Sequence, residues 1–258
     1  MAIGNLWTRE ELILAFNLYL KTDFGKMHST NKDVIHLANL IGRTPNSIAL
    51  RLVNFASVDP VLKARGIKGM DGGRKQVQPI WDEFFNNRQE LLFFSEQILA
   101  EKENSTIEQK YQKELMEITD LVGETKIRAV KTRVNQYVFR QMVTVNYSGK
   151  CAITGIDIPE LLFASHIIPW SQNEKERLNP ENGICLSALY DKAFDKGLIG
   201  INIENKIILS SKLKTYATKE YYHQHFKCFE GQTLLSPTKY HPKQEFLEFH
   251  LDTIFDKC

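Results

Sequence analysis

The sequence predicts an α+β fold that is mostly helical. Through most of the first half of the chain, apolar residues recur at helical spacing, beginning with Leu12, Phe16 and Tyr19. In the second half, the short apolar runs 198–203 and 206–210 have the length and composition of two strands joined by a turn. A chain of 258 residues is long enough for one or two domains with a buried core.

The N-terminal part begins with three predicted helices. The first follows Thr8, which can accept hydrogen bonds from first-turn amides and form a capping box with Glu11. A second helix is predicted over 31–41 and a third over 44–55. Pro45 is tolerated at the start of the third helix because its missing amide proton would have no partner there.

The second and third helices have the outline of a helix-turn-helix. The spacing places Ile48, Leu52 and Phe55 in the core. The polar residues predicted to face outward, where they would contact DNA in the major groove, are Asn46, Arg51 and Asn54. The alternative is a helical packing module whose outward polar residues are merely solvated.

The segment 59–79 is predicted to be a loop because it is rich in glycine and proline. Its basic residues include Arg74 and Lys75, which could contact the phosphate backbone of DNA without reading its sequence. A plain surface loop is the alternative.

Helical patterns continue over 80–119 and 126–145. We therefore predict three parts. A helix-turn-helix-like DNA-recognition domain covers 1–78, a helical connector covers 79–122, and a domain with both strands and helices covers 123–258.

Bulk properties exclude a few classes of protein. A net charge of +2 neither demands nor excludes a polyanionic partner. No apolar run is long enough to cross a bilayer, and the N-terminus does not resemble a secretion signal. The cysteines form no Cys-x-x-Cys pair. We expect a cytoplasmic protein with reduced thiols and no membrane partner.

Three polar residues stand where a strand, a loop, a second strand and a helix would bring them together. His166 lies at the end of the first predicted strand, Asn182 lies in the loop, and Asp191 follows Asn182 by nine residues at the start of a helix. A unit of this kind is a ββα-metal finger.

The motifs around these residues resemble the HNH endonuclease family, in a subgroup similar to restriction endonucleases. That subgroup carries a Cys-Ala-(Ile/Val)-Thr-Gly motif, an (Ala/Ser)-His-Ile-x-Pro-Trp core and an Asn-Gly run that ends in Phe-Asp-x-Gly. The matching segments are Cys151-Ala-Ile-Thr-Gly155, Ser165-His-Ile-Ile-Pro-Trp170, Asn182-Gly183 and Phe194-Asp-Lys-Gly197. The resemblance covers roughly the last half of the chain.

The resemblance implies that His166 is the general base. A neutral imidazole can accept a proton near pH 7, whereas the alternative is a histidine that only fills the core. Asp191 stands where relatives carry His, Asn or Asp, and it would hold one divalent cation at the scissile phosphate. A carboxylate favours Mg²⁺, with Mn²⁺ as the second choice. Asp191 could also cap the helix that follows it.

Three further residues belong to the predicted site. Many HNH sites carry an aspartate before the base as a second metal ligand, and Ser165 stands there instead. Asp195, on the same helix face as Asp191, is either the substitute ligand or a residue that holds the finger by hydrogen bonds. Asn182 completes the catalytic group, where we expect it to anchor the loop through its side chain rather than to bind metal.

Nearby cations could contact DNA phosphates: Arg177, Lys192 and Lys196. A charged surface without a partner is the alternative. Many HNH domains also contain a zinc ion held by two cysteine pairs. The equivalent positions here are Cys151, Thr154, Ser187 and Tyr190, so no structural zinc is expected.

These observations predict a metal-dependent DNA endonuclease that serves in restriction or defence and acts on double-stranded DNA as a homodimer. One alternative is a DNA-binding regulator whose finger has lost its metal. The other is a nuclease directed at RNA.

Overall fold

The computed structural model describes residues 6–116 and 121–257. Contacts within the chain divide it into two compact units, Met1–Val138 and Phe139–Cys258. The boundary falls inside the long helix α8 (Gly123–Asn146). The predicted class, α+β and mostly helical, is confirmed. The division into three domains stays a prediction.

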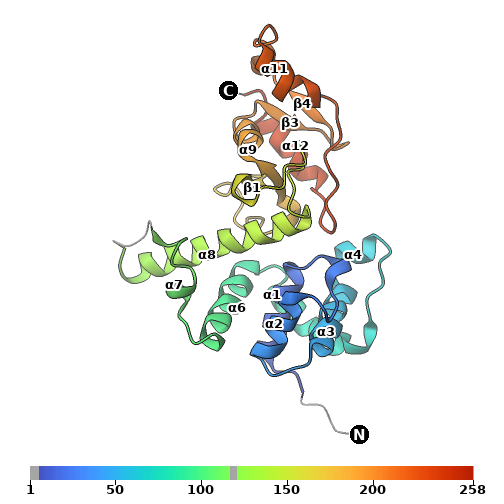
Figure 1. Ribbon diagram of the computed structural model, residues 1–258, viewed down its shortest axis with the longest axis vertical. Helices are drawn as coiled ribbons and strands as arrows, with labels where there is room; N and C mark the ends of the chain where they lie inside the picture. The colour runs from blue at the N-terminus through green and yellow to red at the C-terminus, as the bar shows by residue number, and fades with distance from the viewer. Residues whose placement is uncertain (1–5, 117–120, 258) are drawn as a thin grey trace. The chain divides into compact units, whose positions relative to one another are not determined.

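The described part of the first unit is helical (Figure 1). Its helices before α8 are α1 (Arg9–Leu20), α2 (Lys32–Leu40), α3 (Pro45–Val58), α4 (Pro60–Ala64), α5 (Arg74–Phe84), α6 (Arg88–Lys102) and α7 (Ile107–Lys110). An aromatic cluster forms the core between α1, α3 and α5. The Phe16 ring lies 4.7 Å from that of Phe55 and 5.0 Å from that of Trp81, both stacked.

The predicted starts of the first three helices are confirmed. Thr8 and Glu11 form the capping box of α1. Asn31 caps α2 by accepting from the Asp33 amide, and Thr44 caps α3 with Pro45 in its first turn. Local capping chemistry therefore fixes where these helices begin.

The predicted outward face of α3 is wrong at two positions. Asn46 is exposed, but Arg51 is 8% exposed and Asn54 is 2% exposed. The Asn54 side chain donates from Nδ2 to the Met70 carbonyl at 2.8 Å, and the Arg51 guanidinium lies 4.6 Å from the centre of the Trp7 ring. The segment after α3 folds back over this face and covers it.

The segment 59–79 was predicted to be a loop, and this prediction is wrong because the segment contains helices. Asp59 caps α4 by accepting from the Val61 amide, and Pro60 starts that helix. Arg74 and Lys75 lie in the first turn of α5 rather than in a loop. Glycine and proline do not mark a loop at three of these positions, because Pro60 and Gly73 stand at helix starts and Pro79 lies inside α5.

The helices predicted to form a connector take part in the core of the first unit. Trp81 of α5 belongs to the aromatic cluster. Glu96 of α6 is buried and accepts hydrogen bonds from Asn17 at 2.8 Å and from Tyr111 at 2.6 Å, and it also pairs with Lys21. Protein donors therefore take the place of water at both oxygens of this buried carboxylate.

The second unit begins with the last turns of α8 and contains two small antiparallel sheets (Figure 1). Its elements are β1 (Leu162–His166), β2 (Gly183–Ser187), α9 (Ala188–Asp195), β3 (Ile199–Ile201), β4 (Ile207–Leu209), α10 (Ser211–Lys214), α11 (Glu220–His225) and α12 (Gln244–Thr253). The predicted β3–β4 hairpin is confirmed, with Asn205 at its turn in a left-handed conformation, φ 59°.

Close packing joins α8 to the first sheet. A Cβ atom added to Gly183 would lie 2.4 Å from Val143 Cγ2 and 2.9 Å from Phe139 Cζ. Only glycine allows the first residue of β2 to approach α8 this closely. The last turns of α8 thus form the floor of the β1–β2 hairpin.

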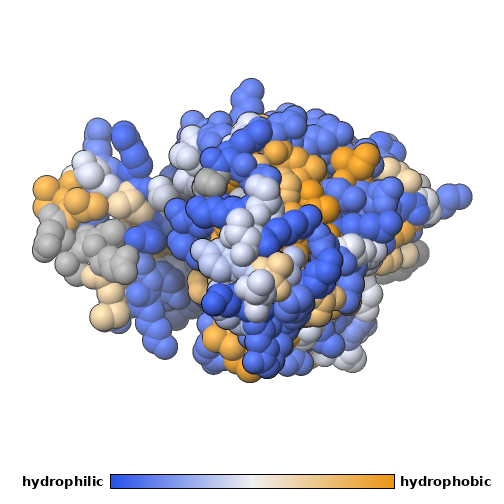
Figure 2. Space-filling model, turned by 90° about the horizontal axis from the view of Figure 1, so that it is seen from above, coloured by the Kyte–Doolittle hydropathy of each residue, from blue (hydrophilic) through white to orange (hydrophobic). Residues whose placement is uncertain are grey.

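The face seen in Figure 2 is hydrophilic over most of its area, with a few apolar patches. The exposed large apolar side chains of the second unit include Ile158, Leu161, Phe163 and Leu189. Across the described ranges, no helix combines the length and apolar character needed to span a bilayer.

Candidate active site

The predicted order of strand, loop, strand and helix is observed around His166. His166 is the last residue of β1, and the antiparallel register places it opposite Gly183 of β2. Asn182 comes directly before β2. Asp191 lies in the first turn of α9, which begins directly after β2 and packs against both strands.

The imidazole of His166 is held on three sides. The Phe139 ring stacks on it at 4.1 Å with an interplanar angle of 14°, and the Trp170 ring meets its edge at 5.5 Å. Nε2 lies 2.8 Å from the Arg177 carbonyl oxygen. Because a carbonyl oxygen only accepts, Nε2 carries the proton. In the neutral ring, Nδ1 is then the unprotonated nitrogen.

The surroundings favour the neutral form of this ring. Burial lowers the pKa of His166, and although the hydrogen bond to Arg177 and the charge of Asp191 raise it, the pKa stays below its usual 6.5. The imidazole is therefore uncharged at pH 7 and able to accept a proton. The influence of Asp191 on this pKa also shows that the carboxylate is electrostatically coupled to the ring.

Asp191 is fixed by its neighbour on β1. The Ser165 hydroxyl donates to Asp191 Oδ1 at 2.5 Å, and Ser165 is buried. This bond occupies one carboxylate oxygen and orients the other, Oδ2. Ser165 thus positions Asp191, and whether it also contacts a metal ion stays a prediction.

Asn182 closes the loop between the two strands. Its Oδ1 accepts from the Ile168 amide at 2.8 Å, and its Nδ2 donates to the carbonyls of Ile168 and Glu176, each at 3.1 Å. The residue is 1% exposed. Its carboxamide is used within the loop, so Asn182 acts as a positioning residue, as its predicted anchoring role requires, rather than as a group that meets substrate.

Residues 151–202 match the model of the HNH endonuclease family. These residues form an HNH endonuclease domain. The match includes β1, β2, α9 and β3, and therefore every residue described above as part of the candidate site except Phe139. No curated protein matches the chain.

The three cations predicted to contact DNA near the site differ in their exposure and in their contacts. Lys192 and Lys196 are exposed on α9. Arg177 donates from Nε to the Trp170 carbonyl at 2.6 Å and stacks over the Trp170 ring, so much of its side chain supports the loop. Contacts of these three residues with DNA stay predictions.

Asp195 is exposed at the end of α9, four residues after Asp191. Burial raises the pKa of its carboxyl, and the charge of Asp191 raises it further, against the effect of Lys192 and Lys196. The two carboxylates are therefore coupled electrostatically. No described hydrogen bond holds the Asp195 carboxylate, so the predicted role as a ligand and the alternative structural role both remain open.

The opening turn of the HNH domain is held by hydrogen bonds around Cys151. Burial raises the pKa of this thiol, but hydrogen bonds from Thr154 and from the backbone at Ile153 and Ser187 outweigh burial and leave the pKa below its usual value. The Ala152 amide also donates to the Cys185 carbonyl at 2.7 Å. Cys151, Thr154 and the Ser187 backbone are therefore joined here by hydrogen bonds, whereas the Tyr190 hydroxyl donates to the His225 carbonyl at 2.7 Å.

The donors of the site fit a hydrated magnesium ion. Within 6–116 and 121–257, no three His, Cys, Asp or Glu side chains lie close enough to form a metal site by themselves. Mg²⁺ retains several waters and needs only one or two carboxylates together with substrate phosphate. Asp191, whose charge acts on the His166 ring, supplies one such carboxylate.

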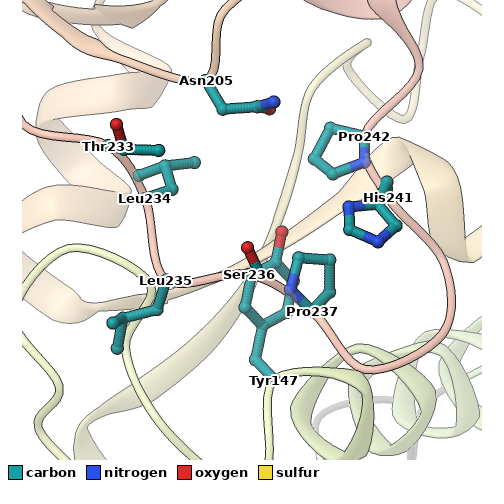
Figure 3. Close-up of a pocket in the computed structure, with 9 residues that line it drawn as sticks. All are labelled: Tyr147, Asn205, Thr233, Leu234, Leu235, Ser236, Pro237, His241 and Pro242. Carbon is teal, nitrogen blue, oxygen red and sulfur yellow. The ribbon is translucent and has the colours of Figure 1, made fainter.

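A separate pocket lies elsewhere in the second unit. It has a volume of about 40 Å³, and Figure 3 shows the Tyr147 ring beside Ser236 and Pro237, with Asn205 and His241 around the same space. None of the predicted site residues lines this pocket. The candidate active site is therefore distinct from this cavity.

Two features of the site could not be read from the sequence. The partner of His166 is a backbone carbonyl, which every residue possesses, so no residue type marks Arg177 for this role. The stacking of Phe139 on the imidazole depends on how α8 approaches the hairpin. In addition, the sequence shows only that Ser165 stands in place of an aspartate, whereas in the structure its hydroxyl orients Asp191.

Replacement of Asn182 tests the loop anchor. Asn182→Ala would leave the Ile168 amide and two carbonyls without their partners in a buried position, so we expect the free energy of unfolding to fall by about 2–4 kcal/mol. Asn173→Ala is the matched control, because Asn173 caps only two amides in the outer part of the same loop. Chemical denaturation measures both. Equal losses in the two variants would contradict the anchoring role.

Proposed function

We propose that the protein is a metal-dependent DNA endonuclease in which the HNH domain hydrolyses phosphodiester bonds. The observation that carries this proposal is the hydrogen bond from His166 Nε2 to the Arg177 carbonyl. It leaves Nδ1 as the basic nitrogen of a neutral imidazole, next to a carboxylate that Ser165 holds in place. A base and a metal ligand beside each other are what hydrolysis of a phosphodiester requires.

His166 acts first in the proposed reaction. Nδ1 takes a proton from a water molecule as the water oxygen attacks phosphorus. The bond between phosphorus and the 3′ oxygen breaks, and the departing 3′ oxyanion takes a proton from solvent water to become a hydroxyl. The stacking on Phe139 and the bond to Arg177 keep the ring from turning as it becomes charged. By resemblance to the family, the products carry 5′ phosphate and 3′ hydroxyl ends.

Asp191 would hold the divalent cation through Oδ2, with Asp195 as a possible second ligand. The ion, when bound, neutralises charge on the scissile phosphate and stabilises the leaving oxygen. We propose Mg²⁺, with Mn²⁺ as an alternative, because the donors are oxygen atoms. Ser165 keeps Asp191 from rotating away from the site.

The HNH domain implies a nucleic acid substrate, and we propose that this substrate is double-stranded DNA. A nuclease of restriction or defence in the cytoplasm would need a part that selects its substrate, and the helical N-terminal unit with its exposed cations supplies a candidate. Cleavage of both strands of a symmetric site requires two copies of the finger, which a homodimer provides.

A plasmid-nicking assay with Mg²⁺ tests the proposed reaction. We expect His166→Ala to reduce the cleavage rate by about 10²- to 10⁴-fold, the usual contribution of a general base. The control is His223→Ala, because His223 is an exposed histidine whose Nε2 also bonds to a backbone carbonyl, that of Ala217 at 2.7 Å. Asp191→Asn should raise the metal concentration needed for half-maximal rate.

Three outcomes of that assay would contradict the proposal. Equal rates in the wild type and His166→Ala would remove the base from the reaction. Binding of DNA without cleavage by the wild type would favour a regulator whose finger has lost its metal. Cleavage of single-stranded RNA in a parallel assay, with plasmid DNA left intact, would favour the RNA-directed nuclease.

The pH dependence of the rate follows from the lowered pKa of His166. A base works only when it is unprotonated, and burial shifts the midpoint of its titration below 6.5. We expect the rate at saturating metal to rise with pH up to a midpoint below 6.5 and then to level off. Circular dichroism at each pH serves as the control for unfolding. A midpoint well above 6.5, or a rate that falls as pH rises through neutrality, would be inconsistent with this base.

A further inference from the structure

Arg51 carries a buried charge without an ionic partner among the described residues. It is 8% exposed, and its Nε and Nη1 atoms make no hydrogen bond with the part of the chain that the structure describes. Guanidinium groups stay protonated in proteins, so this charge cannot be relieved by loss of a proton. A buried charge that lacks a counter-ion is costly to the fold.

The neighbours of Arg51 increase this cost. Its guanidinium lies 4.6 Å from the centre of the Trp7 ring, and that of Arg43 lies 4.4 Å from the same centre. Arg43 is satisfied by Glu11, with Nε–Oε1 and Nη2–Oε2 distances of 2.8 and 2.7 Å. Burial lowers the pKa of Arg51, and the positive charge of Arg43 lowers it further. Trp7 therefore lies next to two cations, of which only Arg43 has a described carboxylate.

The start of α5 lies directly against the unpaired guanidinium. Gly73 is the residue before this helix, and a Cβ atom added to it would lie 2.9 Å from Arg51 Nη1. No side chain caps the first turn, which contains Arg74 and Lys75 and no acidic residue. A 3-10 turn, Asp71–Gly73, leads into this helix. The positive end of a helix attracts anions, and here it adjoins a buried cation that has no carboxylate partner among the side chains that the structure describes.

The first turn of α5 is open to solvent on one side, although Arg51 itself is buried. A Cβ atom added to Gly72 would meet no other atom within 4 Å, and Gly72, Arg74 and Lys75 are exposed. An anion could therefore approach the first turn of α5 from solvent. Gly73 itself admits no side chain, because its added Cβ would lie 2.0 Å from Asn54 Oδ1.

We propose that Arg51 and the first turn of α5 form a binding site for a phosphate group of the DNA backbone. This inference rests on the proposed DNA substrate and assigns a role to the N-terminal unit. A polyanion suits the site better than a free phosphate ion because further cations of the same segment, Lys63 and Lys68, are also exposed. Contact with phosphate positions the duplex without reading its sequence.

The test is DNA binding by the full chain in the His166→Ala background without metal, measured by fluorescence anisotropy over a range of salt. Arg51→Gln should weaken binding equally for two duplexes of unrelated sequence and reduce the slope of log Kd against log salt by about one. Arg74→Gln with Lys75→Gln, on the surface, should weaken binding without any risk to the fold. Arg88→Gln is the control, since Arg88 also stacks on an aromatic ring, Phe85 at 5.1 Å, outside the site.

Three results of these measurements would contradict the proposal. Unchanged DNA affinity in Arg51→Gln and in the double variant overturns the proposed site, even if the nuclease activity stands. Inorganic phosphate could instead stabilise the wild type but not Arg51→Gln, while both variants bind DNA as tightly as the wild type. That result would show that the site binds a small phosphate ligand and would overturn the assignment to DNA. Failure of the wild type to bind DNA would overturn the proposed substrate, and with it this inference.

Discussion

The hydrogen bond from His166 Nε2 to the Arg177 carbonyl determines which nitrogen of the imidazole can act as a base. That bond exists only because the loop between β1 and β2 returns to the end of β1, and Asn182 holds it there through three hydrogen bonds. Gly183 then allows β2 to approach α8, which supplies the Phe139 ring. Packing, loop closure and the chemistry of the site therefore depend on one another.

Burial also determines the protonation state of His166. A half-buried ring stacked on Phe139 resists protonation, whereas the nearby Asp191 carboxylate favours it, and the balance leaves a neutral imidazole. The same carboxylate is oriented by Ser165. Hydrogen bonds and packing, including the hydrogen bonds around Cys151, thus hold the site in place.

Local patterns allowed much of this structure to be predicted. Thr8, Asn31 and Thr44 mark helix starts by capping, and the spacing from Asn182 to Asp191 predicted the finger. The buried state of Arg51 was not predictable, because the segment that covers it is distant in sequence and folds over α3 through Met70 and Gly73. The partner of His166 was also hidden, since it belongs to the backbone. Long-range packing and main-chain contacts cannot be predicted from residue type alone.

The tautomer of His166 tests the central claim most directly. Two-bond proton–nitrogen correlation spectra of the nitrogen-15-labelled protein, with His166→Ala used for assignment, report which ring nitrogen carries the proton. The structure predicts a neutral ring at pH 7 that is protonated at Nε2. A ring protonated at Nδ1, or an imidazolium at pH 7, would contradict the assignment of His166 as the base.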